Sequence, residues 1–207
     1  LAVSTAILRT LEKEKGCPIS GLASHTAGHS LGEYTALCAA GVLNFSEALR
    51  LVRLRGQAMQ KATPPGYGAM AAVLGLDLET VEALLTDFQH ADHLCVVAND
   101  NAPGQVVISG HAAAVNQAMA ATTQAGSKRS ILLAVSAPFH SPLMQPAAEV
   151  MQEALEQTAL QEPTLPVIAN VTARPISDIK SLPPLLAQQI TGRVRWTDSI
   201  KYLAQVG

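Results

Sequence analysis

Short and long hydrophobic segments alternate between Ala69 and Val135, and their order restricts the folds open to this chain more than any other feature. The run begins after a break at Pro64-Pro65-Gly66. Short apolar stretches predict strands, and longer amphipathic stretches predict helices. The predicted strands cover 69–76, 94–98, 105–109 and 130–135, the predicted helices cover 78–89 and 112–125, and a turn is predicted over 99–104. The order strand, helix, strand, strand, helix, strand is that of the ferredoxin-like arrangement, so we expect residues 66–138 to form a small inserted domain.

The flanking residues, 1–65 and 139–207, predict a larger α/β domain. Hydrophobic residues make up 48% of the sequence but aromatic ones only 3%, which is typical of helices packed on a buried parallel sheet. Helices are predicted over 1–16, 31–40, 46–61 and 142–158, a strand over 167–171, and a helical region from 182 through Trp196 to the end. A doubly wound sheet needs more strands than these, so we expect the larger domain to be incomplete and truncated at both ends.

Composition excludes several functional classes. No apolar run approaches the roughly 20 residues of a membrane span, and the first residues indicate an amphipathic helix rather than a signal peptide, so a cytoplasmic location is expected. The net charge of −2, with no block of Lys or Arg, argues against nucleic acid as a partner. Cys17, Cys38 and Cys95 are odd in number and scattered, which favours reduced thiols over a disulfide or a zinc site.

One pentapeptide carries a chemical signal. Gly28-His29-Ser30-Leu31-Gly32 matches G-x-S-x-G, in which a serine sits on a tight turn from strand to helix and the glycines allow close backbone packing. The following helix directs its positive end toward the serine, so the Leu31 N–H is aimed where an oxyanion would form. The pentapeptide alone leaves a second interpretation open, in which Ser30 is only a helix cap.

The other groups needed for catalysis are ambiguous from residue types alone. Serine needs a base within hydrogen-bond reach, and the chain has six histidines. An arginine could hold a substrate carboxylate through two parallel hydrogen bonds, but Arg50, Arg53 and Arg55 share one predicted helix, where each could equally be a solvated charge. Asn99, Asn101 and Gln105 are interpreted as turn residues.

Several blocks occur together in one order, and they extend over essentially the whole chain. They are GHSLGEY at 28–34, LVRLRGQAM at 51–59, GAMAAV at 68–73, PGQVVISG at 103–110 and SAPFHSPLM at 136–144. In this combination the sequence closely resembles the malonyl-CoA:acyl carrier protein transacylase family, the acyltransferases of fatty acid and polyketide synthesis. The resemblance implies a hydrolase-like α/β domain carrying a ferredoxin-like insert, in agreement with the expected domain division.

The resemblance also implies a role for each site residue. Ser30 matches the nucleophile, His140 the base, Arg55 the arginine that holds the malonyl carboxylate, and His29 a supporting histidine whose side chain points away from Ser30. Phe139 resembles the form that takes malonyl rather than methylmalonyl groups. The implied partners are malonyl-CoA and acyl carrier protein, with no metal and no bound cofactor, since the coenzyme A thioester is itself the substrate.

The family pattern leaves three expectations and several alternatives. A Gly-Gln-Gly-Ser-Gln loop that completes the oxyanion hole would precede Leu1, a Gly-Pro-Gly segment would follow Gly207, and the groups that orient His140 would lie beyond the end. The 207 residues are therefore expected to be inactive alone. The alternatives are a serine thioesterase or lipase-like hydrolase, an acyltransferase domain of a polyketide synthase, a malonate decarboxylase subunit, and a module that binds carrier protein without turnover.

Overall fold

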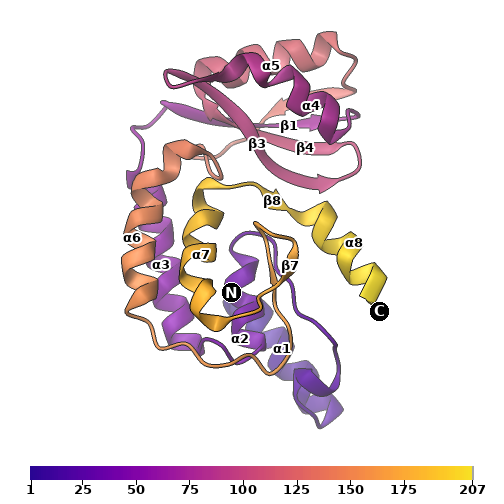
Figure 1. Cartoon of the computed structure of the whole chain (residues 1–207), viewed down its shortest axis with the longest axis vertical. Coiled ribbons are helices and arrows are strands. Elements are labelled where there is room, and N and C mark those ends of the chain that lie inside the picture. Colours follow the sequence, from indigo (N-terminus) through magenta and orange to yellow (C-terminus); the bar gives the residue numbers. More distant parts are fainter. Residues whose placement is uncertain (207) are drawn as a thin grey trace.

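The computed structural model describes residues 1–206 and shows a mixed α/β fold (Figure 1). One part is an antiparallel sheet in the order β2-β3-β4-β1-β5, and β8 adds to β3 in parallel. Two helices, α4 and α5, pack on one face of this sheet. The bounds are β1 Gly68–Leu74, α4 Leu78–Leu84, β2 Gln89–His90, β3 His93–Ala102, β4 Gln105–His111, α5 Ala112–Gln124, β5 Arg129–Leu132 and β8 Val194–Arg195.

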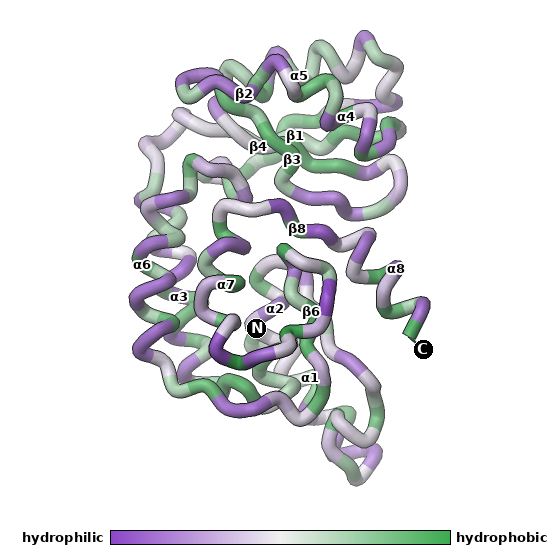
Figure 2. The backbone as a smooth tube through the Cα atoms, in the orientation of Figure 1, coloured by the Kyte–Doolittle hydropathy of each residue, from purple (hydrophilic) through white to green (hydrophobic). Residues whose placement is uncertain are grey.

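Alternate residues of the central strands point to opposite faces of the sheet. On β1, Ala71 and Val73 are fully buried and pack under α4 and α5, where Val81, Val115 and Ala118 meet them. Met70 and Ala98 lie in a second, smaller cluster that also includes Val107. Both faces of the sheet are therefore covered, and Figure 2 shows the hydrophobic stretch along β3.

The elements of residues 66–138 occur in the predicted order, with several local differences. The predicted strands 69–76 and 130–135 end early, at Leu74 and Leu132. The predicted helix over 78–89 ends at Leu84 and is followed by a 3₁₀ turn at Thr86–Phe88. The predicted turn at 99–104 is wrong for its first four residues, because β3 continues to Ala102 through register shifts opposite β4. The two-residue β2, which pairs with the start of β3, was not expected.

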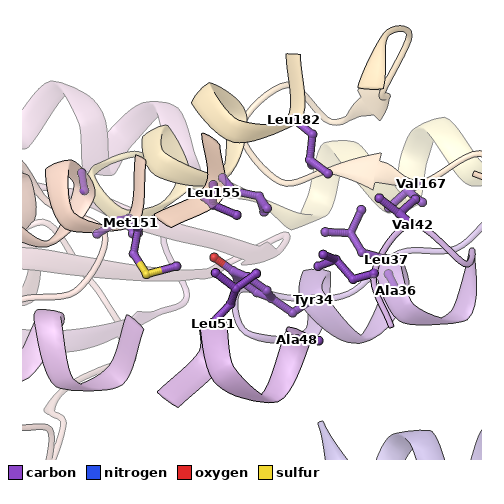
Figure 3. Close-up of a cluster of buried hydrophobic side chains, with 14 of the residues drawn as sticks. Tyr34, Ala36, Leu37, Val42, Ala48, Leu51, Met151, Leu155, Val167 and Leu182 are labelled. Atoms are coloured by element: carbon purple, nitrogen blue, oxygen red, sulfur yellow. The ribbon is translucent and has the colours of Figure 1, made fainter. Parts of the chain in front are cut away.

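The other part is mainly helical. Its helices are α1 Ala2–Lys15, α2 Gly32–Ala39, α3 Phe45–Lys61, α6 Gln145–Glu156, α7 Leu182–Thr191 and α8 Trp196–Val206, with the short hairpin β6 Ile168–Ala169 and β7 Arg174–Pro175. Figure 3 shows the core that α2, α3, α6 and α7 share, in which Tyr34, Leu37 and Leu51 meet Met151 and Leu155. The predicted continuous helical region from 182 is wrong, because Gly192 is extended and β8 separates α7 from α8.

Of the parallel sheet expected for residues 1–65 and 139–207, the described residues show little. Thr26 pairs with Val167 in a single parallel bridge, and this bridge places the segment before Ser30 beside β6. Between residues 1 and 206, no helix combines the length and the apolar character required to cross a bilayer.

Candidate active site

Ser30 occupies a sharp turn between the Thr26 bridge and α2. Its φ angle of 53° lies in the left-handed region, which a residue with a side chain adopts at a cost of about 1–3 kcal/mol. Gly28 makes this turn possible, because a Cβ on Gly28 would lie 2.0 Å from the Gly32 carbonyl oxygen. Gly32 is different, since a Cβ there would meet nothing within 4 Å. Of the two glycines in the pentapeptide, only Gly28 is required by close packing.

Gly28→Ala is expected to lower the free energy of unfolding by more than about 2 kcal/mol, because backbone must move to accept the new methyl group. Gly32→Ala is the matched control and is expected to raise it by up to about 1 kcal/mol, since Gly32 begins α2 and alanine favours helix. Denaturant unfolding of the complete gene product measures both changes. Equal effects of the two substitutions would contradict the elbow geometry.

His140 meets Ser30 although the two lie 110 positions apart. The His140 Nε2 atom is 2.7 Å from the Ser30 Oγ atom, and Nδ1 is 2.7 Å from the Gln189 carbonyl oxygen. A carbonyl can only accept, so His140 carries its proton on Nδ1 and presents an unprotonated Nε2 to the serine hydroxyl. The expectation that the orienting group would lie beyond the end of the chain is wrong, because α7 supplies it.

The surroundings of His140 keep it neutral. The pKa of His140 is lowered to about 4, chiefly by burial and then by the nearby positive charge of Arg55, while hydrogen bonds with the backbone at Gln189 and Gly192 act in the opposite direction. Only 4% of the His140 surface is exposed. At neutral pH the imidazole is therefore unprotonated at Nε2 and able to accept a proton.

Arg55 is the arginine of α3 that reaches the site. Its Nη2 atom donates to the Ser30 Oγ atom at 3.1 Å and to the Gln189 Oε1 atom at 3.1 Å. The Arg55 Nε atom is buried and has no hydrogen-bond partner in residues 1–206. Arg53 is exposed, and Arg50 is exposed and bonds Glu47 on the same helix. The fold thus separates three arginines that the sequence could not.

Leu31 is the residue whose amide was predicted to receive an oxyanion. The Ser30 N–H donates to the Asn170 Oδ1 atom at 2.7 Å, whereas the N–H groups of Gly32, Glu33 and Tyr34 donate to backbone carbonyls. Within the described part of the chain, the Leu31 N–H has no acceptor. It is therefore the amide of this turn that is free to bind an incoming oxygen.

His29 and Phe139 are the residues that precede Ser30 and His140 in the chain. The His29 Nε2 atom is 2.8 Å from the Asn101 Oδ1 atom, and its ring packs edge-on against Trp196. The interpretation of Asn101 as a turn residue is wrong, because Asn101 belongs to β3 and holds His29 toward the sheet. Phe139 is half-buried and contacts both the helical core and the Met70 cluster, so it bridges the two parts of the fold.

Three polar residues that the sequence reasoning missed complete the network. Gln189 donates from Nε2 to the Ser30 carbonyl at 3.0 Å and to the Glu33 Oε2 atom at 2.7 Å. Glu33 is buried, and this burial raises the pKa of its carboxyl to about 7, despite the hydrogen bonds from Gln189 and Asn170. Asn170 bonds the turn on both sides of His29.

Two of these three residues had a readable signal. Asn170 is a polar residue at the end of the predicted strand 167–171, the position where α/β folds place functional groups. Glu33 is the only charged residue of α2, among Tyr34, Ala36 and Leu37. Gln189 had none, because it lies within the predicted helical region from 182 and its side-chain partners, Ser30, Glu33 and Arg55, are more than 130 positions away.

The cysteines stand apart from this network. All three are free thiols, and burial raises the pKa of Cys95 to about 12 and that of Cys38 above its usual value. Across residues 1–206, no three side chains of His, Cys, Asp or Glu converge as they would around a metal ion.

Comparison with known proteins identifies relatives along the whole length. The sequence pattern of the acyl transferase domain matches residues 3–199. The malonyl CoA-acyl carrier protein transacylase of Bacillus subtilis (strain 168) is 43% identical over 206 residues, which cover 100% of this chain and 64% of that protein. The chain therefore spans less than two thirds of the length of this relative.

Solved structures agree in fold. The acyl-carrier-protein-S-malonyltransferase from Bartonella henselae superimposes with a TM-score of 0.94 at 48% identity, over 100% of this chain and 65% of that one. A malonyl-transacylase in complex with its type II PKS acyl-carrier protein superimposes with a TM-score of 0.91 at 41% identity, over 99% of this chain and 64% of that one. On the match to its sequence pattern and on these relatives, the chain belongs to the acyl transferase domain family.

Proposed function

We propose that this chain carries the reacting groups of an acyltransferase that moves a malonyl group from malonyl-CoA to the phosphopantetheine thiol of acyl carrier protein, for fatty acid biosynthesis. The observation that carries the proposal is the convergence on one oxygen atom: Ser30 Oγ lies 2.7 Å from His140 Nε2 and 3.1 Å from Arg55 Nη2. A base and a guanidinium at the same hydroxyl suit acylation by a substrate that bears its own carboxylate.

In the first half-reaction, Ser30 becomes acylated. His140 Nε2 takes the hydroxyl proton while Ser30 Oγ attacks the thioester carbon, and the Leu31 N–H stabilises the oxyanion that forms. The carbon–sulfur bond then breaks and coenzyme A leaves as the thiol, with the proton from His140. Arg55 holds the distal carboxylate of the malonyl group throughout. The product is a malonyl ester on Ser30.

In the second half-reaction, the carrier protein replaces coenzyme A. His140 takes the proton of the phosphopantetheine thiol, whose sulfur attacks the ester carbon, and the proton then returns to Ser30 Oγ as the bond to serine breaks. Because the first product leaves before the second substrate reacts, the kinetics are ping-pong. Each step uses groups of the chain or of the substrates, so no metal and no bound cofactor enters the scheme.

The domain division and the location are part of the same proposal. Residues 1–65 and 139–207 would form the hydrolase-like domain that carries Ser30, His140 and Arg55, and residues 66–138 the ferredoxin-like insert. Phe139, at the junction, would favour malonyl over methylmalonyl, by the roughly 1–3 kcal/mol that one methyl group permits. Three free thiols fit the cytoplasmic location that we propose.

Two features favour transfer over hydrolysis. A serine hydrolase ordinarily orients its histidine with a carboxylate, whereas His140 donates to the Gln189 carbonyl. Arg55 is only 6% exposed and contacts Ser30, and in a site for uncharged esters its guanidinium would have no substrate carboxylate to bind. An acyltransferase domain of a polyketide synthase would share both features, and the carrier protein that accepts the malonyl group distinguishes the two.

The complete gene product, incubated with malonyl-CoA, is expected to gain the mass of one malonyl group, located on the peptide that contains Ser30. Intact-mass and peptide mass spectrometry measure this gain, and Ser30→Ala should abolish it. Addition of holo acyl carrier protein should then remove the group from Ser30 and place it on the carrier. Release of free malonate at the same rate without carrier would support the hydrolase instead, and no mass gain would refute the proposal.

A further inference from the structure

Asn170 is almost fully enclosed beside the turn that carries Ser30. Only 1% of its surface is exposed. Its Oδ1 atom accepts from the Ser30 N–H at 2.7 Å, and its Nδ2 atom donates to the Gly28 carbonyl at 2.8 Å. Its backbone is held as well, since the Asn170 N–H donates to Glu33 Oε2 at 3.2 Å and its carbonyl accepts from the Arg195 N–H at 3.0 Å.

The Asn170 side chain makes a hydrogen bond that the backbone would make in a regular parallel strand pair. The Thr26 N–H donates to the Pro166 carbonyl, and the Ile168 N–H donates to the Thr26 carbonyl, as in a parallel pair. In that pattern the next amide along, that of Asn170, would donate to the Gly28 carbonyl. The backbone amide turns instead to Glu33, and the side-chain amide of the same residue bonds Gly28.

This replacement matters because Ser30 is strained. Its left-handed φ of 53° must be held by its surroundings, and its carbonyl is held by Gln189 Nε2 and by the Glu33 N–H. Its N–H is held by Asn170 alone. A primary amide is suited to the task, since it supplies an acceptor for Ser30 and a donor for Gly28 from one rigid plane.

We infer that Asn170 is a positioning residue, whose side-chain amide fixes the left-handed turn at Ser30 and, by occupying the Ser30 N–H, leaves the Leu31 N–H as the amide that faces the oxyanion. This inference rests on the proposed role of Ser30 as nucleophile. Asn170 acts only through the turn, because the polar atoms of its side chain bond the backbone of Ser30 and Gly28 and not the reacting hydroxyl.

Asn170→Asp tests the need for both a donor and an acceptor. The ionised carboxyl can still accept from the Ser30 N–H, but its second oxygen repels the Gly28 carbonyl oxygen. The protonated carboxyl again offers one acceptor to Ser30 and one donor to Gly28, as the amide does. At pH 8 we expect malonylation of Ser30 to be about 100-fold slower than in the unchanged protein, the scale of a misplaced reacting group. The ratio of the two rates should rise toward one as pH falls to 5.5. His140, whose pKa is about 4, stays largely unprotonated over this range. Glu33, which accepts from the Asn170 N–H and has a pKa of about 7, titrates within it in every variant, so its effect on the rate is measured by the control variant below.

Asn170→Ala is the matched control, because it removes both hydrogen bonds and introduces no titrating group. Its rate ratio is expected to stay low and constant from pH 8 to 5.5. Stopped-flow acylation on the complete gene product, with rates corrected for the folded fraction measured by near-UV circular dichroism, gives both ratios. The malonyl-CoA concentration at half-maximal rate should not change, since Arg55 is untouched.

The outcomes separate this inference from the proposed function. If the unchanged protein is never malonylated, the proposed function fails. If the unchanged protein is malonylated and Asn170→Asp has the same rate ratio at pH 8 and 5.5, or both variants react at the unchanged rate, the inference about Asn170 fails alone. Should Asn170→Asp fold only in acid, a rate at pH 5.5 at least about 10-fold above that of Asn170→Ala supports the inference, and equal rates overturn it.

Discussion

Replacing His140 with alanine is expected to slow malonylation of Ser30 by about 1,000-fold, within the range that general base catalysis contributes. The serine hydroxyl would lose its hydrogen-bond partner 2.7 Å away, and Arg55, the other group at the same oxygen, is a donor and cannot take the proton. Stopped-flow acylation of the complete gene product by malonyl-CoA measures the rate.

The pH dependence of the acylation rate gives a second test of His140 as the base. Because the pKa of His140 is lowered to about 4, its base form persists in acid, and the acylation rate of the unchanged protein should hardly fall between pH 7 and 5.5. A histidine with a pKa of 6.5 would by then be about nine-tenths protonated. His111→Ala serves as the comparison, since His111 bonds Tyr67 and the Leu94 amide within the sheet. A rate that falls tenfold over this range, or a His140→Ala protein as fast as the His111→Ala protein, would contradict the assignment.

Local sequence patterns predicted most of the helices and strands, because the hydrophobic periodicity of each element lies within its own residues. The alternation of strands and helices over 66–138 is correct in order, and α3 begins and ends within one residue of its predicted bounds. The errors fall where tertiary contacts override local signals. Asn99 to Ala102 resemble a turn by composition, but pairing with β4 extends them.

The site was predictable only as far as side-chain chemistry marks it. Ser30 carries a motif and His140 a matching block, but nothing in residue type predicts that the Gln189 carbonyl orients His140. The same holds for the Ser30 N–H, whose acceptor on Asn170 is 140 positions away. Contacts of this kind depend on how α7 and β6 pack against the turn, and packing of distant segments leaves little trace in a local pattern.

Replacing Arg55 with alanine is expected to slow malonyl transfer by about 100-fold or more, because a substrate carboxylate loses charge-assisted hydrogen bonds worth about 1.5–3 kcal/mol each. Acetyl transfer is expected to be spared or improved. An acetyl group has no carboxylate to hold. The charge of Arg55 lowers the pKa of His140, so its removal raises that pKa and makes His140 a stronger base. Parallel acylation of the complete gene product with malonyl-CoA and acetyl-CoA measures the two effects.

Two further variants on the same helix sharpen this comparison. Arg50→Ala, at an exposed arginine paired with Glu47, should leave both rates unchanged. Arg55→Lys keeps the charge but not the planar pair of donors, so its malonyl rate should lie between those of Arg55→Ala and the unchanged protein. The preference for malonyl over acetyl therefore reports the carboxylate contact, whereas a general loss of structure would lower both rates together. If Arg55→Ala lowers the two rates equally, Arg55 supports the site through Ser30 and Gln189 rather than by binding malonyl.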